Sequence, residues 1–82
     1  MILVDIYVPS VDKTYDFQLN EQIPVAMVLE EISEMIGQKE HAALKGNISD
    51  LILCSYDTGA ALSKEKNLEQ AGIITGNKLL LV

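Results

Sequence analysis

The chain opens and closes with apolar, strand-like segments, and the need to bury both is the strongest constraint on its fold. Residues 2–8 alternate in period two and carry β-branched side chains on one parity, which is typical of a strand. Residues 78–82 are almost all apolar. A strand this apolar would aggregate at an exposed sheet edge, so we expect it at the centre of a sheet. The partner available to it is the equally apolar segment 2–8.

The segment between these strands predicts a second strand followed by a long helix. Residues 9–13 have the composition of a turn and residues 15–19 alternate again, so the chain should open with an antiparallel hairpin. From Pro24, which suits a first helical turn, apolar side chains recur at helical spacing. They are Val25, Val28, Leu29, Ile32 and Ile36. Gly37 is placed to cap a helix over residues 24–36, and no side chain before Pro24 is a strong N-terminal cap.

The rest of the chain predicts shorter elements. They are one helical turn at 40–44, a strand at 51–56, a tight turn at 57–59, a short edge strand at 60–63 and a helical turn at 67–72. The helix must cover one face of the sheet to bury its apolar stripe. We therefore predict an α+β protein with the β-grasp fold, in which one main helix crosses a mixed sheet of four to five strands. At this length a single domain spanning residues 1–82 is expected.

Composition favours a small cytoplasmic protein stabilised by its core. Hydrophobic residues make up 49% of the 82 residues, and the single cysteine, Cys54, excludes an intrachain disulfide. This cysteine content fits a reducing compartment, and Asp5 interrupts the apolar start before it could act as a signal peptide. The 12 acidic residues outnumber the 6 basic ones, which disfavours nucleic acids and anionic membrane surfaces as partners. No apolar run approaches the roughly 20 residues that membrane insertion requires.

The sequence contains no recognisable constellation of catalytic or metal-binding residues. Cys54 is expected to be a structural thiol inside an apolar strand, and His41 a surface histidine. With one cysteine and one histidine in the whole chain, neither a structural zinc site nor an iron–sulfur cluster can be assembled. Glu30, Glu31 and Glu34 fit the solvated face of a helix. We therefore expect a protein that is not an enzyme and that holds no cofactor or metal.

A pattern of leucines, one isoleucine and glycines precedes and enters the last strand. It is Leu68-x-x-x-Gly72-Ile73-x-x-Gly76-x-x-Leu79-x-Leu81. Together with the opening hairpin and the helix at Pro24, this pattern resembles the ubiquitin-like superfamily over essentially the whole chain. The resemblance implies that the leucines and Ile73 fill the core, and that the glycines let the chain turn back into the last strand.

Within that superfamily the chain is most similar to the bacterial YukD (EsaB) group, which accompanies type VII (WXG100/Esx) secretion systems. The likeness rests on the Pro24-Val25 start of the helix, a loose segment before the third strand, and a last strand that ends at Val82. It implies a small, non-catalytic cytoplasmic protein that is an accessory or regulatory part of the secretion machine. Type VII secretion components are the protein partners that it implies.

An alternative within the superfamily is a protein modifier or sulfur carrier. Such proteins end in a flexible tail closing with Gly-Gly, whose terminal carboxylate must enter an enzyme's active site. Here Val82 lies inside the expected last strand, and a β-branched terminus held in a sheet could not thread such a site. The alternative therefore requires a natural chain that extends to Gly-Gly.

Strand parity predicts an apolar surface on the sheet face away from the helix. The even-numbered residues of the first strand should face the helix with Leu79 and Leu81. This leaves Leu3, Asp5 and Tyr7 on the open face, and Cys54 of the third strand should join that face. The apolar residues expected on the open face are Leu3, Tyr7, Ile52, Tyr56, Leu80 and Val82. On adjacent strands they would form one patch that binds a protein partner or, in a homodimer, a second copy of the chain. Tyr7 and Tyr56 are its expected aromatic anchors.

Overall fold

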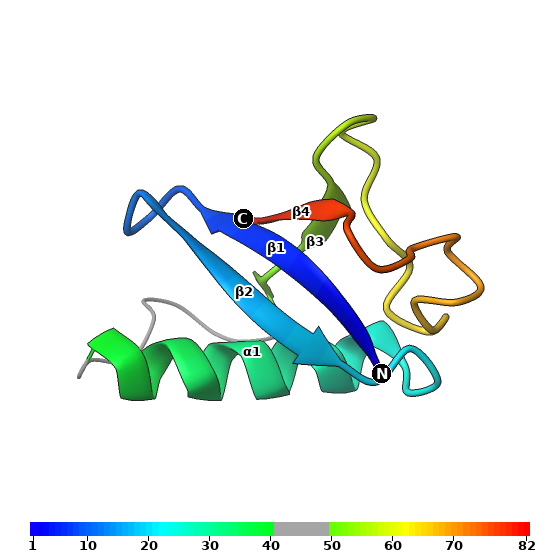
Figure 1. Cartoon of the computed structure of the whole chain (residues 1–82), viewed down its shortest axis with the longest axis horizontal. Helices are drawn as coiled ribbons and strands as arrows, with labels where there is room; N and C mark the ends of the chain where they lie inside the picture. Colours follow the sequence, from blue (N-terminus) through cyan, green and yellow to red (C-terminus); the bar gives the residue numbers. More distant parts are fainter. Residues whose placement is uncertain (41–49) are drawn as a thin grey trace.

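The computed structural model of the chain describes residues 1–40 and 50–82, and in it one helix crosses one face of a four-stranded sheet (Figure 1). The elements in chain order are β1 Ile2–Val8, β2 Lys13–Leu19, α1 Val25–Glu40, β3 Leu53–Ser55 and β4 Lys78–Leu81. The order across the sheet is β2-β1-β4-β3, so β4 lies inside the sheet beside β1. The predicted β-grasp architecture, with the first and last strands paired at its centre, is confirmed.

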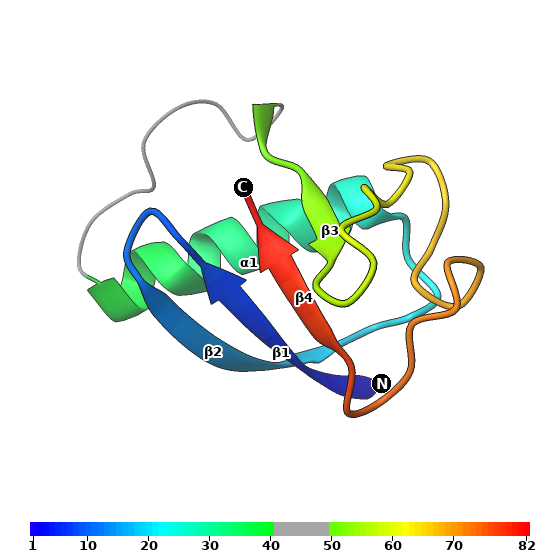
Figure 2. The same cartoon turned by 90° about the horizontal axis from the view of Figure 1, so that it is seen from above.

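The register of the sheet joins segments from opposite ends of the chain, and Figure 2 shows β4 between β1 and β3. β1 pairs antiparallel with β2 along the full length of both strands. β1 is parallel to β4, with Tyr7 beside Leu80, and β3 is antiparallel to β4. Two backbone hydrogen bonds between Ile52 and Val82, 2.7 and 2.9 Å long, continue the last pairing past the strand ends. This register places the residues of β1, β4 and β3 that point away from α1 next to one another.

The core lies between the sheet and α1. From the strands it contains Val4, Ile6, Val8, Tyr15, Phe17, Leu19, Leu53, Leu79 and Leu81, and from α1 it contains Val25, Val28, Leu29, Ile32 and Ile36. These are the side chains on the helix-facing parity of each strand and on one stripe of the helix. Their burial confirms the predicted parity of β1 and β4 and the predicted apolar stripe.

α1 continues beyond the predicted end of the helix. The sequence predicted a helix over residues 24–36, whereas α1 ends at Glu40. The predicted cap at Gly37 is wrong, because Gly37 lies inside α1 and does not have the positive φ of a capping glycine. A glycine costs a helix about 1 kcal/mol relative to alanine, which does not end it when good helix formers follow. Residues 41–49, with His41 and most of the predicted turn at 40–44, lie outside the described residues.

The first turn of α1 is capped by backbone carbonyls from a distant loop. The Val25 N–H donates to the carbonyl of Lys66 at 2.8 Å, and the Ala26 N–H donates to the carbonyl of Lys64 at 3.1 Å. The first N–H groups of any helix have no partner within it. These two bonds therefore explain how α1 begins directly after Pro24 without a side-chain cap.

The loop that supplies these carbonyls is held by its own hydrogen bonds. Asn67 Oδ1 accepts from the Gln70 N–H at 2.7 Å, and Gln70 Oε1 accepts from the Asn67 N–H at 3.0 Å. This reciprocal pair has the arrangement of a capping box. The Ala71 N–H then donates to the Asn67 carbonyl at 3.2 Å, and the chain reverses at Gly72, where φ is 78°. The brief helical turn predicted at 67–72 agrees with this geometry.

The edge of the sheet beyond β3 is shorter than predicted. The edge strand expected at 60–63 is reduced to a single bridge between Cys54 and Ala61, and β3 covers only part of the predicted 51–56. The Leu62 N–H still donates to the Leu53 carbonyl at 2.8 Å. After Leu62 the chain leaves the sheet, because the carbonyls of Lys64 and Lys66 are bonded to the start of α1. The sheet consequently has four strands, the lower end of the predicted range.

Candidate protein-interaction surface

The residues predicted for a binding surface lie on the sheet face turned away from α1, here called the outer face. They are Leu3, Tyr7, Ile52, Tyr56, Leu80 and Val82, here called the apolar patch. Leu3 is 53% exposed and Val82 is 51% exposed, while Tyr7 and Leu80 are half-buried. These residues lie on neighbouring strands or directly next to the strand ends, since Tyr7 pairs with Leu80 and Ile52 is bonded to Val82. Their placement follows the predicted parity, and their part in binding stays a prediction.

Cys54 has the parity of the outer face but is closed to solvent. Its register position is opposite Leu80, and it forms the bridge to Ala61. The residue is 7% exposed and its thiol is free of any disulfide. This burial agrees with the structural role expected for the thiol, and it leaves Cys54 outside the apolar patch.

A lysine lies over the two tyrosine rings of the patch. Lys78 Nζ is 4.2 Å from the ring centroid of Tyr56 and 5.9 Å from that of Tyr7, which are cation–π distances. The Tyr7 hydroxyl donates a hydrogen bond to Asp12 Oδ1 at 2.8 Å. This bond, followed by desolvation, raises the pKa of Tyr7 above its usual value, so the hydroxyl stays protonated. Lys78 was not among the predicted surface residues, because its place between the two rings depends on the strand register.

Two aspartates face each other beside this cluster. Asp5 on β1 is directly opposite Asp16 on β2, and on its other side Asp5 is next to Lys78 on β4. The pKa of Asp5 is raised, first by a hydrogen bond with Asp16, then by desolvation and by the charge of Asp16, while Lys78 acts in the opposite direction. Like charges directly opposite across a strand pair destabilise a sheet. Asp5 and Asp16, here called the acidic pair, are therefore a local cost to stability.

Replacing Asp16 with asparagine is expected to raise the thermal midpoint of unfolding at pH 7. Because folding raises the pKa of Asp5, the folded state binds the carboxyl proton of Asp5 more tightly than the unfolded chain does. The stability that this proton contributes is full below the unfolded pKa of Asp5 and is lost as pH rises through the raised folded pKa. The gain from Asp16→Asn should be full at neutral pH and shrink in acid, where Asp5 is protonated in both proteins. Thermal unfolding followed by circular dichroism at neutral and acidic pH measures this difference.

Asp5→Asn is the matched control for this change. It removes the same repulsion but also removes the attraction between Asp5 and Lys78, so its gain should be smaller. A midpoint for Asp16→Asn at or below that of the unmodified protein at pH 7 would contradict the assignment of repulsion to the acidic pair.

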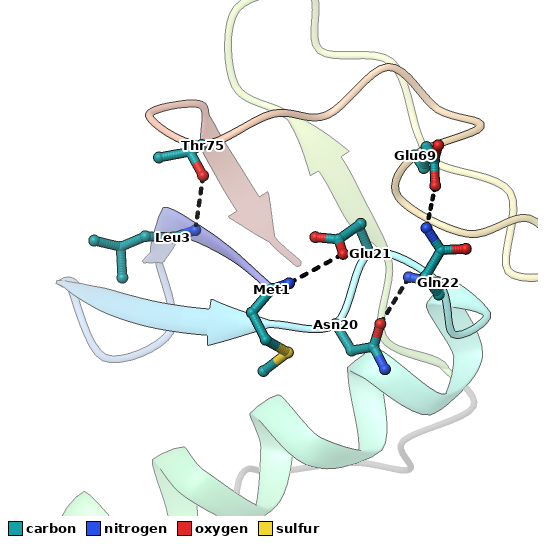
Figure 3. A network of polar contacts seen from close by, with 7 residues as sticks. All are labelled: Met1, Leu3, Asn20, Glu21, Gln22, Glu69 and Thr75. Atoms are coloured by element: carbon teal, nitrogen blue, oxygen red, sulfur yellow. Dashed lines mark hydrogen bonds and ion pairs between the residues drawn. The ribbon is translucent and has the colours of Figure 1, made fainter.

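A second exposed apolar group lies at one end of the outer face. Ile74 is 64% exposed, and the turn that carries it lies beside Leu3: Thr75 Oγ1 accepts from the Leu3 N–H at 3.2 Å, and the Gly76 N–H donates to the Leu3 carbonyl at 2.9 Å. Figure 3 shows Thr75 close to Leu3. Ile74 was not among the predicted surface residues, because strand parity says nothing about the side chains of a turn.

Polar contacts hold the same end of the molecule together (Figure 3). The ammonium group of Met1 forms an ion pair with Glu21 at 3.1 Å. The Gln22 N–H donates to Asn20 Oδ1 at 2.9 Å, and the Gln22 amide group donates to the carboxylate of Glu69. These contacts connect β1, the segment before α1 and the loop before β4. All of them are solvent-accessible, so each is worth little by itself.

Several solved structures have the same arrangement of elements. The EccD5 ubiquitin-like domain from Mycobacterium xenopi superposes with a TM-score of 0.81 at 20% identity, covering 99% of this chain and 91% of that one. The N-terminal ubiquitin-like domain in the 4931431F19Rik protein gives 0.76 at 26% identity, covering 99% and 72%. Ubiquitin from Caldiarchaeum subterraneum gives 0.73 at 18% identity, covering 98% and 89%. The chain has a ubiquitin-like fold. No family model and no curated protein matches the sequence.

The sequence pattern behind the predicted resemblance has the expected structural roles in this ubiquitin-like fold. Its apolar members are all buried, namely Leu68, Ile73, Leu79 and Leu81. Gly72 and Gly76 have φ angles of 78° and 94°, a region that side chains with a Cβ rarely adopt. The two glycines therefore allow the reversals that lead the chain from Leu68 into β4.

The other candidate sites considered from the sequence add no binding geometry. Glu30, Glu31 and Glu34 are exposed on α1, as the solvated-face interpretation predicted. Over residues 1–40 and 50–82, no group of three or more histidine, cysteine or acidic side chains is placed to hold a metal ion. In the same part of the chain, no helix is both long and apolar enough to cross a membrane.

Proposed function

We propose that the chain is a non-catalytic ubiquitin-like adaptor that binds proteins through the outer face of its sheet. The observation that carries the proposal is the apolar patch, in which large exposed side chains occupy neighbouring strands on the face that α1 does not cover. Contiguous apolar patches of this kind commonly mark interfaces on small proteins. The rings of Tyr7 and Tyr56 belong to the residue types that contribute most to binding energy.

The polar side chains beside the apolar patch are consistent with binding rather than catalysis. Asp12 accepts the hydrogen bond of the Tyr7 hydroxyl, which keeps that hydroxyl protonated and a poor nucleophile. Lys78 lies over the Tyr56 ring, and the Cys54 thiol is buried. Nucleophilic catalysis requires an activated nucleophile with an adjacent base. Tyr7 and Asp12 place a hydroxyl beside a carboxylate, but the raised pKa of Tyr7 opposes ionisation of that hydroxyl, so we infer a structural role for this hydrogen bond.

The setting that we propose is a bacterial type VII secretion system, in which the chain is an accessory component in the cytoplasm. The support is the resemblance of the sequence to the YukD (EsaB) group together with the ubiquitin-like fold. The likeness to the EccD5 domain of Mycobacterium xenopi, with nearly complete coverage of both chains, adds a bacterial ubiquitin-like domain of similar size.

Affinity purification from the native host tests the proposal. The tagged protein is expected to recover secretion components, and Leu80→Asp should lower that recovery about tenfold or more, because it introduces a charge into the middle of the apolar patch. Leu80 is only half-buried, so the variant should keep its circular dichroism spectrum.

The matched control is Met27→Asp, which introduces the same charge at an exposed apolar residue of α1. It should recover partners as the unmodified protein does. Absence of every secretion component from the unmodified sample, or equal recovery by Leu80→Asp, would contradict the proposed function.

A further inference from the structure

Asp5 of the acidic pair lies within the apolar patch, and Asp16 flanks the patch on the edge strand β2. Along β1 the outer-face residues are Leu3, Asp5 and Tyr7, so Asp5 has a patch residue on each side at the two-residue spacing of a strand, about 7 Å. Across the sheet, Asp5 lies between Asp16 and Lys78. A partner that covers Leu3 and Tyr7 therefore has to cover Asp5 as well.

The negative charge of the pair is only partly offset within the chain. Lys78 is close enough to act on Asp5, yet its ammonium group lies over the Tyr56 ring at 4.2 Å and forms no ion pair with either aspartate. Both aspartates are exposed. A partner that desolvates this region without bringing a positive charge would leave two carboxylates buried side by side, which is costly.

A second copy of this chain is a poor partner for the outer face. A two-fold dimer uses the same patch on both subunits, so it would bring two acidic pairs into one interface. Each chain also carries a net charge of −6, which slows the approach of a second copy. The favoured occupant is a different protein with the opposite charge at its centre.

We propose, building on the proposed function, that the outer face binds a partner segment in which an arginine or lysine is flanked by apolar side chains. The cation lies against the acidic pair and relieves its repulsion, and the flanking groups cover the apolar patch on either side. The acidic pair then selects among apolar partners by charge, while the apolar patch supplies most of the buried area.

A peptide titration tests the charge requirement directly. The probes are a synthetic amphipathic peptide of leucine and arginine and its twin with glutamate at every arginine position, each added to isotope-labelled protein and followed by NMR. The arginine peptide is expected to shift the amide signals of Leu3, Asp5 and Leu80, and to bind about tenfold or more tightly than its twin. Equal binding of the two peptides, binding of neither, or shifts confined to α1 would overturn the proposal.

Two double variants test whether the acidic pair is responsible for the preference for the arginine peptide. The double variant Asp5→Asn/Asp16→Asn should weaken binding of the arginine peptide about fivefold or more and make it less sensitive to salt. The control Glu30→Gln/Glu31→Gln makes the same change in net charge on α1 and should leave the affinity within about twofold. Equal losses in the two double variants would show only a general charge effect and would overturn the proposal.

Recovery of the native partner by two variants distinguishes this inference from the proposed function. In the affinity purification, both Leu80→Asp and Asp5→Asn/Asp16→Asn should lose the partner. If Leu80→Asp loses it and the asparagine variant retains it, the interaction face stands and the charge selection is refuted. If neither variant loses it, the proposed function and this inference both fail.

Discussion

Replacing Leu79 with alanine is expected to cost about 2–5 kcal/mol of unfolding free energy. Leu79 is fully buried on the central strand β4, in contact with the core on the helix-facing side of the sheet. The loss combines the missing hydrophobic burial with the cavity that rigid neighbours leave behind. For the 82 residues of this chain, typical stabilities are about 4–12 kcal/mol, so the loss is a large share of the total and the midpoint of unfolding should fall clearly.

Leu80→Ala is the control for this prediction, because it makes the same chemical change one residue further on. Leu80 is half-buried on the outer face and is absent from the core cluster. The unfolding free energy lost in Leu80→Ala should be about 1 kcal/mol or less. Urea unfolding of both variants, compared at equal m-values, measures the difference. Similar losses at Leu79 and Leu80 would mean that the two faces of β4 are not energetically distinct.

The contrast between these leucines also shows why most of the fold was predictable. A strand alternates its faces strictly, so the sequence alone assigns Leu79 to the core and Leu80 to the outer face. The same reasoning, applied with helical spacing, assigned the buried stripe of α1. The placement of residues 78–82 beside residues 2–8 followed because neither apolar segment could be left at an edge.

Features that depend on contacts between distant backbone segments were not predictable in this way. The helix passes Gly37 because local propensity is weak compared with the burial of Ile36 and the helix formers that follow. The edge strand at 60–63 is cut short because carbonyls of the following residues bond to the start of α1. Neither effect has a signature in the periodicity of the segment concerned.

The candidate surface also has a part that the sequence predicts and a part that it does not. Its apolar members follow from strand parity, which needs only the sequence and the side of the sheet that the helix covers. Lys78 and the acidic pair depend on the register, which sets Asp5 opposite Asp16 and next to Lys78. A shift by one residue would send these side chains to the other face. Parity alone places Asp5 on the outer face, but its two charged neighbours, Asp16 and Lys78, became visible only with the structure.

Leu68→Ala is expected to destabilise the protein by about 2–5 kcal/mol and to loosen the start of α1 at the same time. Leu68 is fully buried although it belongs to the loop before β4, and it anchors that loop in the core. The residues just before it, Lys64 and Lys66, supply the carbonyls that cap α1. Loss of the anchor should therefore release these carbonyls in part, and hydrogen exchange at the Val25 and Ala26 amides should become faster.

Asn67→Ala distinguishes the anchor from the local turn. It removes the reciprocal hydrogen bonds with Gln70 but leaves Leu68 in the core, so its cost should be about 1 kcal/mol. Exchange at Val25 and Ala26 should then rise much less than in Leu68→Ala, because the loop stays attached. If Leu68→Ala destabilises the protein while the exchange of these two amides, relative to the core of the sheet, stays unchanged, the loop does not control the start of α1. The missing side-chain cap before Pro24 would then require a different explanation.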